Sequence, residues 1–236
     1  MENQYQITEG SRIESNALTF VRLMRNVYAW MAAGLAITAL TALIVVNSPS
    51  MLSVIYSSKL IFFGLFIAEI AMVWILSSRI SSMSFITAGC MFAIYAILNG
   101  LTMSVIFLAY SMNVIVQTFA ITACVFGAMS LLGLFIKKDL STLGRILYMT
   151  LIGLIIATIV NLFAHNTGLA MVINYAGVLI FVGLTVYDSQ KIKNMMLEYG
   201  QDESMSGKLA VWGSLMLYLD FINLFLYILR FVGGRK

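Results

Sequence analysis

Seven long apolar segments constrain the fold of this chain more than any other feature of its sequence. A helix needs about 20 apolar residues to cross the hydrocarbon core of a bilayer. Transmembrane strands would instead show segments of about ten residues with alternating polarity. The sequence therefore predicts an all-α integral membrane protein with seven membrane-spanning helices. The segments are residues 27–46, 60–77, 85–108, 114–136, 146–163, 169–187 and 209–229.

The composition agrees with a membrane protein. Of 236 residues, 61% are hydrophobic and only 10% are charged, whereas a soluble domain has about 25% charged residues. Cys90 and Cys124 both lie in apolar segments, so we expect neither a disulfide framework nor a metal cluster. We attribute the net charge of +4 to membrane topology rather than to nucleic-acid binding. We expect residues 1–26 to form a polar cytoplasmic tail and 27–236 a single seven-helix membrane domain.

The distribution of Lys and Arg predicts the orientation, because these residues concentrate in cytoplasmic loops. Placing the N-terminus in the cytoplasm leaves ten of them inside and four outside, so we expect a cytoplasmic N-terminus. Two alternatives remain for the basic tail. Seven full crossings place it outside, whereas a last segment that dips in and returns places it inside and changes the count to thirteen against one. The outer four are Lys59, Arg230, Arg235 and Lys236.

A carboxyl group interrupts the last apolar segment. Asp220 has about ten uncharged residues on either side, and an ionised side chain there costs roughly 2.5–3.5 kcal/mol on insertion scales. Asn223 and Tyr227 share its helical face, as do Gly213 and Met216. This face predicts either an ion or proton site inside a helix bundle, or a packing face where a protonated Asp220 holds helices together.

Asp188 follows the end of the sixth apolar segment, and Lys191 follows three residues later. One interpretation is an interfacial ion pair between these two residues. The other depends on whether Asp188 meets Asp220. Two adjacent carboxyl groups cannot easily both ionise, so such a pair would share a proton. It would act as a proton-controlled latch that ties two helices when neutral, and repels itself and attracts a cation when ionised.

Glu69 lies in the middle of the second apolar segment, and Arg79 lies at its cytoplasmic end. Glu69 either lines an aqueous path or is a buried, protonated carboxyl group. Arg79 is either the cation that engages an acidic pair or an ordinary positive anchor. Carboxylate oxygens suit hard cations such as calcium. Glu69, Asp188 and Asp220 therefore predict a transient, low-affinity calcium site, with calcium as a permeant ion and no cofactor.

We expect no catalytic residue. His165 is the only histidine and falls in a short connector, so Ser214 lacks the facing histidine of an intramembrane serine protease. A retinal protein needs a lysine deep in its last helix, and Lys208 precedes the start of this one. Phosphate-loop, metal and nucleotide motifs are absent from the sequence. The sequence therefore predicts a protein that is not an enzyme.

Three motifs resemble those of the Bax inhibitor-1 family, the transmembrane Bax-inhibitor-motif proteins. SLMLYLDFINLFLYILRFVGG at 214–234 closely resembles the C-terminal signature of the family, and LTVYDSQKIK at 184–193 resembles its preceding motif. KKDLSTLGRIL at 137–147 is similar to the connector between its fourth and fifth helices. The match spans the membrane region in order and spacing. The chain is identified as a bacterial member of the family.

The resemblance implies a seven-helix bundle with a central C-terminal helix, in the inner (plasma) membrane. It also implies a pH-sensitive calcium leak channel, in which Asp188 and Asp220 form the proton-sensing pair, Arg79 engages that pair and Glu69 lines the pore. We expect Asn223 and Tyr227, which share the helical face of Asp220, to support the pair. An alternative is a regulatory membrane protein that binds and modulates a membrane protease or another complex. A proton-coupled transporter is a third possibility.

Overall fold

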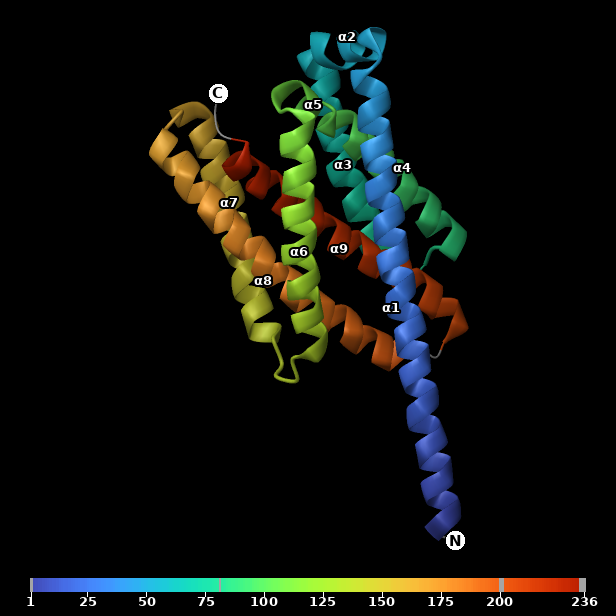
Figure 1. The fold of residues 1–236 in the computed structure, drawn as a ribbon. Helices are drawn as coiled ribbons and strands as arrows, with labels where there is room; N and C mark the ends of the chain where they lie inside the picture. The colour runs from blue at the N-terminus through green and yellow to red at the C-terminus, as the bar shows by residue number, and fades with distance from the viewer. Residues whose placement is uncertain (1, 81, 200–201, 234–236) are drawn as a thin grey trace. The chain divides into compact units, whose positions relative to one another are not determined.

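A computed structural model describes the backbone of residues 2–80, 82–199 and 202–233, and side chains from residue 20 onward in these ranges except at 203 and 204. All regular structure in these residues is helical (Figure 1). The helices are α1 (Glu2–Val46), α2 (Pro49–Ser57), α3 (Lys59–Arg79), α4 (Phe85–Met103), α5 (Val105–Ala109), α6 (Met112–Phe135), α7 (Ser141–Ala164), α8 (Thr167–Tyr199) and α9 (Glu203–Val232).

Seven stretches of the described chain are long and apolar enough to cross a membrane, which confirms the predicted number of spans. The third of them, Phe85–Ala109, comprises α4 and α5. The helix is interrupted at Ser104, whose hydroxyl donates to the Leu101 carbonyl at 2.7 Å. The short helix α2 follows the first span and precedes the second. Hydropathy therefore located every span.

The sixth span is longer than predicted. The apolar segment ends at residue 187, which left open whether the helix continues past Asp188, and α8 does continue, to Tyr199. Ile192 and Met196 explain the extension, because they are 1% and 3% exposed and lie on one face of the continuing helix. Asp188 therefore lies inside α8 rather than at a helix end.

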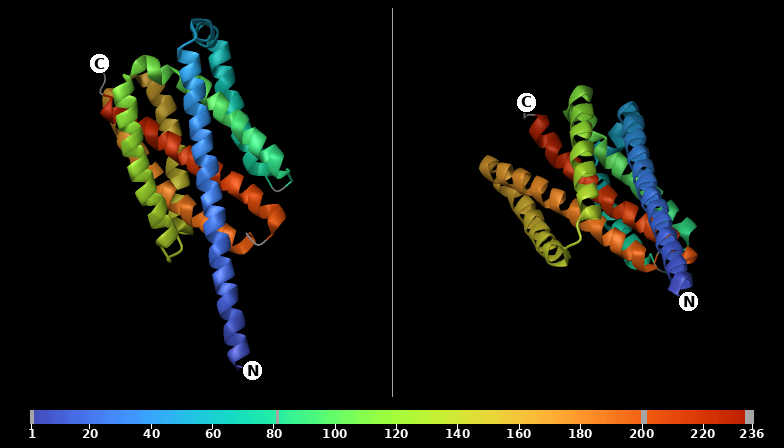
Figure 2. Two further views of the ribbon diagram at one scale, coloured as in Figure 1. Left: turned by 45° about the vertical axis from the view of Figure 1, so that its right-hand side comes forward. Right: turned by 60° about the horizontal axis from the view of Figure 1, so that its bottom comes forward.

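The last span is one unbroken helix (Figure 2). α9 contains 30 residues, and at about 1.5 Å per residue it exceeds the roughly 30 Å of the hydrocarbon core. A segment that dips in and returns would need a break, so α9 favours the alternative with seven full crossings. Arg235 and Lys236, which bear on that question, lie outside the described residues.

The predicted N-terminal tail is helical in its backbone. α1 begins at Glu2 and runs without a break to Val46 (Figure 2). The side chains of the first 19 residues, including that of Arg12, lie outside the described part of the chain. The cytoplasmic location of residues 1–26 stays a prediction.

Contacts between residues divide the chain into two compact units, and α8 and α9 each contribute to both. The first unit comprises residues 1–104 and 192–215. In it α4 packs against α1 and α3, and Gly100 allows the close approach to α1, because a Cβ there would lie 2.6 Å from Thr41 Cβ. The second unit comprises residues 105–191 and 216–236 and contains the two aspartates singled out by the sequence.

Candidate proton and ion site

Asp188 and Asp220 are buried in the second unit, each only 3% exposed. Asp188 is on α8 and Asp220 on α9, and α7 contributes Tyr148. The Tyr148 hydroxyl donates to both carboxyl oxygens of Asp188, at 3.1 Å to Oδ1 and 3.2 Å to Oδ2. A single phenol therefore anchors the buried Asp188 carboxyl group, on which the charge of Lys191 also acts.

The two aspartates lie close enough for their charges to interact, and both act on the Tyr148 hydroxyl. The Oδ2 atom of Asp220 is buried and has no hydrogen-bond partner in the described part of the chain. A buried polar oxygen without a partner is costly and uncommon in a folded protein. Such an oxygen is a ready acceptor for a proton or a cation.

The stretch of α8 around Asp188 is fixed to its surroundings by hydrogen bonds. Ser189 and Ser130 of α6 share a hydroxyl–hydroxyl bond of 2.7 Å. The Gln190 side chain holds the connector between α6 and α7 by three further bonds. It donates to the carbonyls of Ile136 at 3.1 Å and Lys138 at 2.8 Å, and accepts from the amide of Leu140 at 2.9 Å.

The two predicted supporting residues make other contacts. The Asn223 amide donates to the Leu219 carbonyl of its own helix at 2.8 Å. The Tyr227 ring stacks on Phe181 of α8, with ring centroids 5.8 Å apart and an interplanar angle of 27°. Asn223 and Tyr227 therefore contribute to the helix and to packing, and their support of the aspartates stays a prediction.

Glu69 lies in the first unit, on α3, and is 8% exposed. The hydroxyl of Thr102 on α4 donates to its Oε1 at 2.7 Å, and the Asn99 amide also acts on this carboxyl group. The Oδ1 of Asn99 is buried and has no hydrogen-bond partner among the described residues. Three oxygen-bearing side chains thus meet in the interior of this unit.

Arg79 is exposed at the C-terminal end of α3 in the first unit, whereas the two aspartates belong to the second unit. Its engagement of the aspartates stays a prediction. In the described part of the chain, no three carboxyl, thiol or imidazole side chains lie together so that they could hold a metal ion. Transient calcium binding by Glu69, Asp188 and Asp220 stays a prediction.

Tyr148 and Thr102 were not predicted from the sequence as site residues. A signal for Tyr148 was available, because a phenol inside an apolar segment needs a hydrogen-bond partner when it is buried. Thr102 gave a weaker signal, since threonines in membrane helices often bond to their own backbone. Thr102 does so here as well, donating to the Asn99 carbonyl at 2.9 Å. Its bond to Glu69 depends on the packing of α3 against α4.

Comparison with known proteins places these residues in a family. The family model described as "Inhibitor of apoptosis-promoting Bax1" matches residues 21–236. The inner membrane protein YbhL of Escherichia coli is 43% identical over 214 residues, which cover 90% of this chain and 92% of the relative. Uncharacterized proteins of Deinococcus radiodurans and Borreliella burgdorferi are 40% and 39% identical over 212 and 215 residues. The Deinococcus match covers 90% of this chain and 90% of the relative. The Borreliella match covers 91% of this chain and 93% of the relative. The chain therefore belongs to the Bax inhibitor-1 family of membrane proteins, as its motifs predicted.

Proposed function

We propose that this protein is a slow calcium leak channel of the inner membrane, with its N-terminus in the cytoplasm and with Asp188 and Asp220 as a proton-controlled gate. The observation that carries the proposal is the pair itself. Two buried carboxyl groups lie within electrostatic range of each other, and Oδ2 of Asp220 lacks a hydrogen-bond partner among the described residues. Packing alone does not explain two carboxyl groups in membrane helices. An amide or a hydroxyl can hydrogen-bond between helices at a lower free-energy cost of insertion.

The gate follows from the chemistry of two neighbouring carboxyl groups. With one proton shared between them, Asp188 keeps its bond from Tyr148 and the pair ties α8 to α9. When both groups are ionised, they repel each other and together attract a divalent cation. A rise in pH therefore loosens the contact between the helices and creates a site for calcium in the same step. We expect calcium leak to increase as the pH rises.

Glu69 supplies the second element of the proposal. Its carboxyl group, the Thr102 hydroxyl and the unpartnered Asn99 carbonyl oxygen are the hard oxygen ligands that calcium prefers. Stable calcium sites use six to eight oxygens, so three side chains would bind the ion only briefly, as permeation requires. We propose that Glu69 lines the path and that Arg79 is a counter-charge for the aspartate pair.

Purified protein in liposomes that contain a calcium-sensitive dye tests the gate. We expect the wild-type leak to vary with pH and the Asp220→Asn leak to be nearly independent of pH, because a neutral amide cannot titrate. Asp139→Asn is the matched control, since Asp139 is exposed and precedes the first residue of α7. It should leave the pH dependence intact.

A double-mutant comparison sharpens this test. If the two aspartates act as one unit, Asp188→Asn and Asp220→Asn should each remove the pH dependence and their combination should add little. Fully additive effects would contradict a shared gate. Equal, pH-dependent calcium leak through the wild type and Asp220→Asn would contradict a gate that depends on Asp220.

A further inference from the structure

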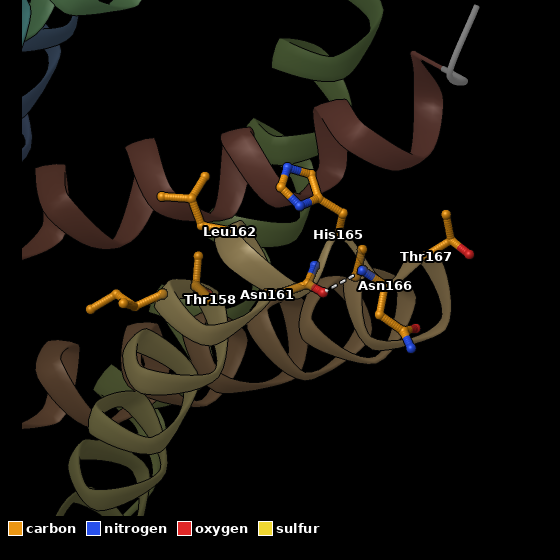
Figure 3. Close-up of a pocket in the computed structure, with 8 residues that line it drawn as sticks. Thr158, Asn161, Leu162, His165, Asn166 and Thr167 are labelled. Carbon is orange, nitrogen blue, oxygen red and sulfur yellow. Dashed lines mark hydrogen bonds between the residues drawn. The ribbon is translucent and has the colours of Figure 1, made fainter. Parts of the chain in front are cut away.

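A cavity of about 660 Å³ lies in the second unit, where α7 ends, α8 begins and α9 ends. A smaller cavity of about 360 Å³ shares Thr158, Asn161, Thr167 and Ala170 with it. Figure 3 shows the smaller cavity, with Asn161 turned toward the backbone of Asn166. The larger volume is typical of a small-molecule site. None of the residues that line either cavity belongs to the aspartate site described above.

Among the described residues that line the larger cavity, Arg230 is the only charged one. Its guanidinium donates one hydrogen bond, to Oδ1 of Asn174 at 3.3 Å, and lies 5.3 Å from the centre of the Tyr227 ring. Within the described part of the chain it forms no ion pair with a carboxylate. A guanidinium carries five N–H donors. Arg230 therefore offers a positive charge and spare donors to the cavity.

Two asparagines in the cavity wall are set to donate rather than accept. Asn174 Oδ1 already accepts from Arg230, and Asn161 Oδ1 accepts the Asn166 backbone amide at 3.0 Å. Each Oδ1 thus already accepts one bond, and the NH₂ of each side chain can only donate. The described lining of the cavity thus combines one cation with two amide donors and has no carboxyl group. This set of groups favours an anion.

The cavity lies at the ends of membrane spans, where the headgroups of lipids are found. Arg230 is two residues from the end of the last span, Met205–Val232, and Asn161 is three residues from the end of the fifth, Ser141–Ala164. Tyr175 and Phe231 line the cavity with rings 4.8 Å apart and are 62% and 40% exposed. Tyr is one of the two aromatic residues that are enriched at the membrane–water interface.

We propose that this cavity binds the phosphate of an anionic phospholipid headgroup. Arg230 contacts the phosphate oxygens as a planar fork, which matches the geometry of a phosphodiester. The amides of Asn161 and Asn174 donate to the remaining oxygens. The exposed rings of Tyr175 and Phe231 lie beside the glycerol and upper acyl region. The site is a lipid-binding site separate from the gate, and does not depend on calcium conduction.

Native mass spectrometry of the detergent-purified protein, with graded phosphatidylglycerol or phosphatidylcholine, measures the binding. We expect one preferred phosphatidylglycerol on the wild type. Arg230→Gln should weaken its binding by roughly tenfold or more, because a charge-assisted bidentate contact is lost. Arg145→Gln is the matched control. It removes the same charge from the first turns of α7, outside the cavity lining, and should retain the lipid.

Asn174→Asp is a second test of the site, which distinguishes lost lipid binding from misfolding of Arg230→Gln. A carboxylate at this position pairs with Arg230 inside the protein and repels a phosphate, so binding should be lost while thermal stability is retained. Equal retention of phosphatidylglycerol by the wild type, Arg230→Gln and Asn174→Asp would overturn the proposal. So would equal losses in Arg230→Gln and Arg145→Gln. Displacement of the lipid by millimolar inorganic phosphate or glycerol 3-phosphate would identify a soluble anion as the ligand and refute the lipid assignment.

Discussion

Tyr148 holds the carboxyl group of Asp188 through both of its oxygens, at 3.1 and 3.2 Å. The bond joins α7 to α8, and the charge of Asp220 also acts on the phenol. A carboxylate that is anchored in this way keeps its position whether its neighbour carries a proton or not. Tyr148 is therefore a positioning residue for the proposed gate.

Tyr148→Phe tests this role. The change keeps the ring and its edge contact with Tyr187 (centroids 6.1 Å apart) and removes the donor to Asp188. Loss of a hydrogen bond to a buried carboxyl group should cost about 1–3 kcal/mol of unfolding free energy in detergent. We also expect faster calcium leak at acidic pH, because the latch is less well held.

Tyr187→Phe is the control for Tyr148→Phe. The Tyr187 hydroxyl forms no hydrogen bond with a side chain or backbone group in the part of the chain that the structure describes. Its removal should change the unfolding free energy by less than about 0.5 kcal/mol. Equal losses in the two variants would mean that the Tyr148 bond to Asp188 contributes nothing specific.

Gly133 and Gly127 of α6 form a second matched pair. A Cβ at Gly133 would collide with the Val186 carbonyl and the Ser189 side chain, on either side of Asp188 in α8. A Cβ at Gly127 meets nothing within 4 Å. Gly133→Ala should therefore lower the unfolding free energy by about 1–3 kcal/mol through overpacking. Gly127→Ala should be neutral or slightly stabilising, by up to about 1 kcal/mol. Equal stabilities would contradict the close packing of α6 against α8.

The helices of this fold are largely readable from the sequence because the bilayer imposes a one-dimensional constraint. Each crossing needs a long apolar segment, and the seven spans follow from that requirement alone. Hydropathy alone could not fix the end of α8 at Tyr199, because it falls after residue 187 although Ile192 and Met196 still pack inside the protein. The end of an apolar segment therefore does not mark the end of the helix that contains it.

The candidate site is less accessible to sequence reasoning. Asp220 and Glu69 stand out because their charge is costly in a membrane segment. Their partners do not, since Tyr148 and Thr102 are common in apolar segments and gain meaning only from contacts between helices. Asp188 on α8 and Asp220 on α9 lie close enough for their charges to interact. The resemblance to the family implied that pairing, and spacing along the chain did not.

Gln190 provides a third test, by hydrogen exchange. Gln190→Met keeps the length of the side chain and removes the three bonds that hold the connector before α7. The Leu140 amide, which loses its acceptor, should exchange roughly tenfold faster or more. Gln117→Met is the control, because Gln117 is exposed on α6. Unchanged exchange in Gln190→Met would show that the connector is held by other contacts.

Asp139 provides the last test, outside the membrane spans. Its Oδ1 accepts bonds from the Ser141 hydroxyl at 2.6 Å and the Ser141 amide at 2.9 Å. These bonds lower the pKa of Asp139 below its ordinary value, with the hydroxyl as the larger cause. Because the folded pKa is lower than the unfolded one, ionised Asp139 stabilises the start of α7 above about pH 4, and the contribution is lost as the pH falls through the folded pKa.

Ser141→Ala should return the pKa of Asp139 toward its ordinary value, because the larger of the two bonds is removed and only the amide remains. The carboxyl ¹³C shift of Asp139, followed by NMR as the pH is lowered, measures this change. Ser141→Thr keeps a hydroxyl in the same place, and its titration should match the wild type. An unchanged pKa in Ser141→Ala would show that the amide alone stabilises the carboxylate. The start of α7 would then depend on its backbone rather than on its first side chain.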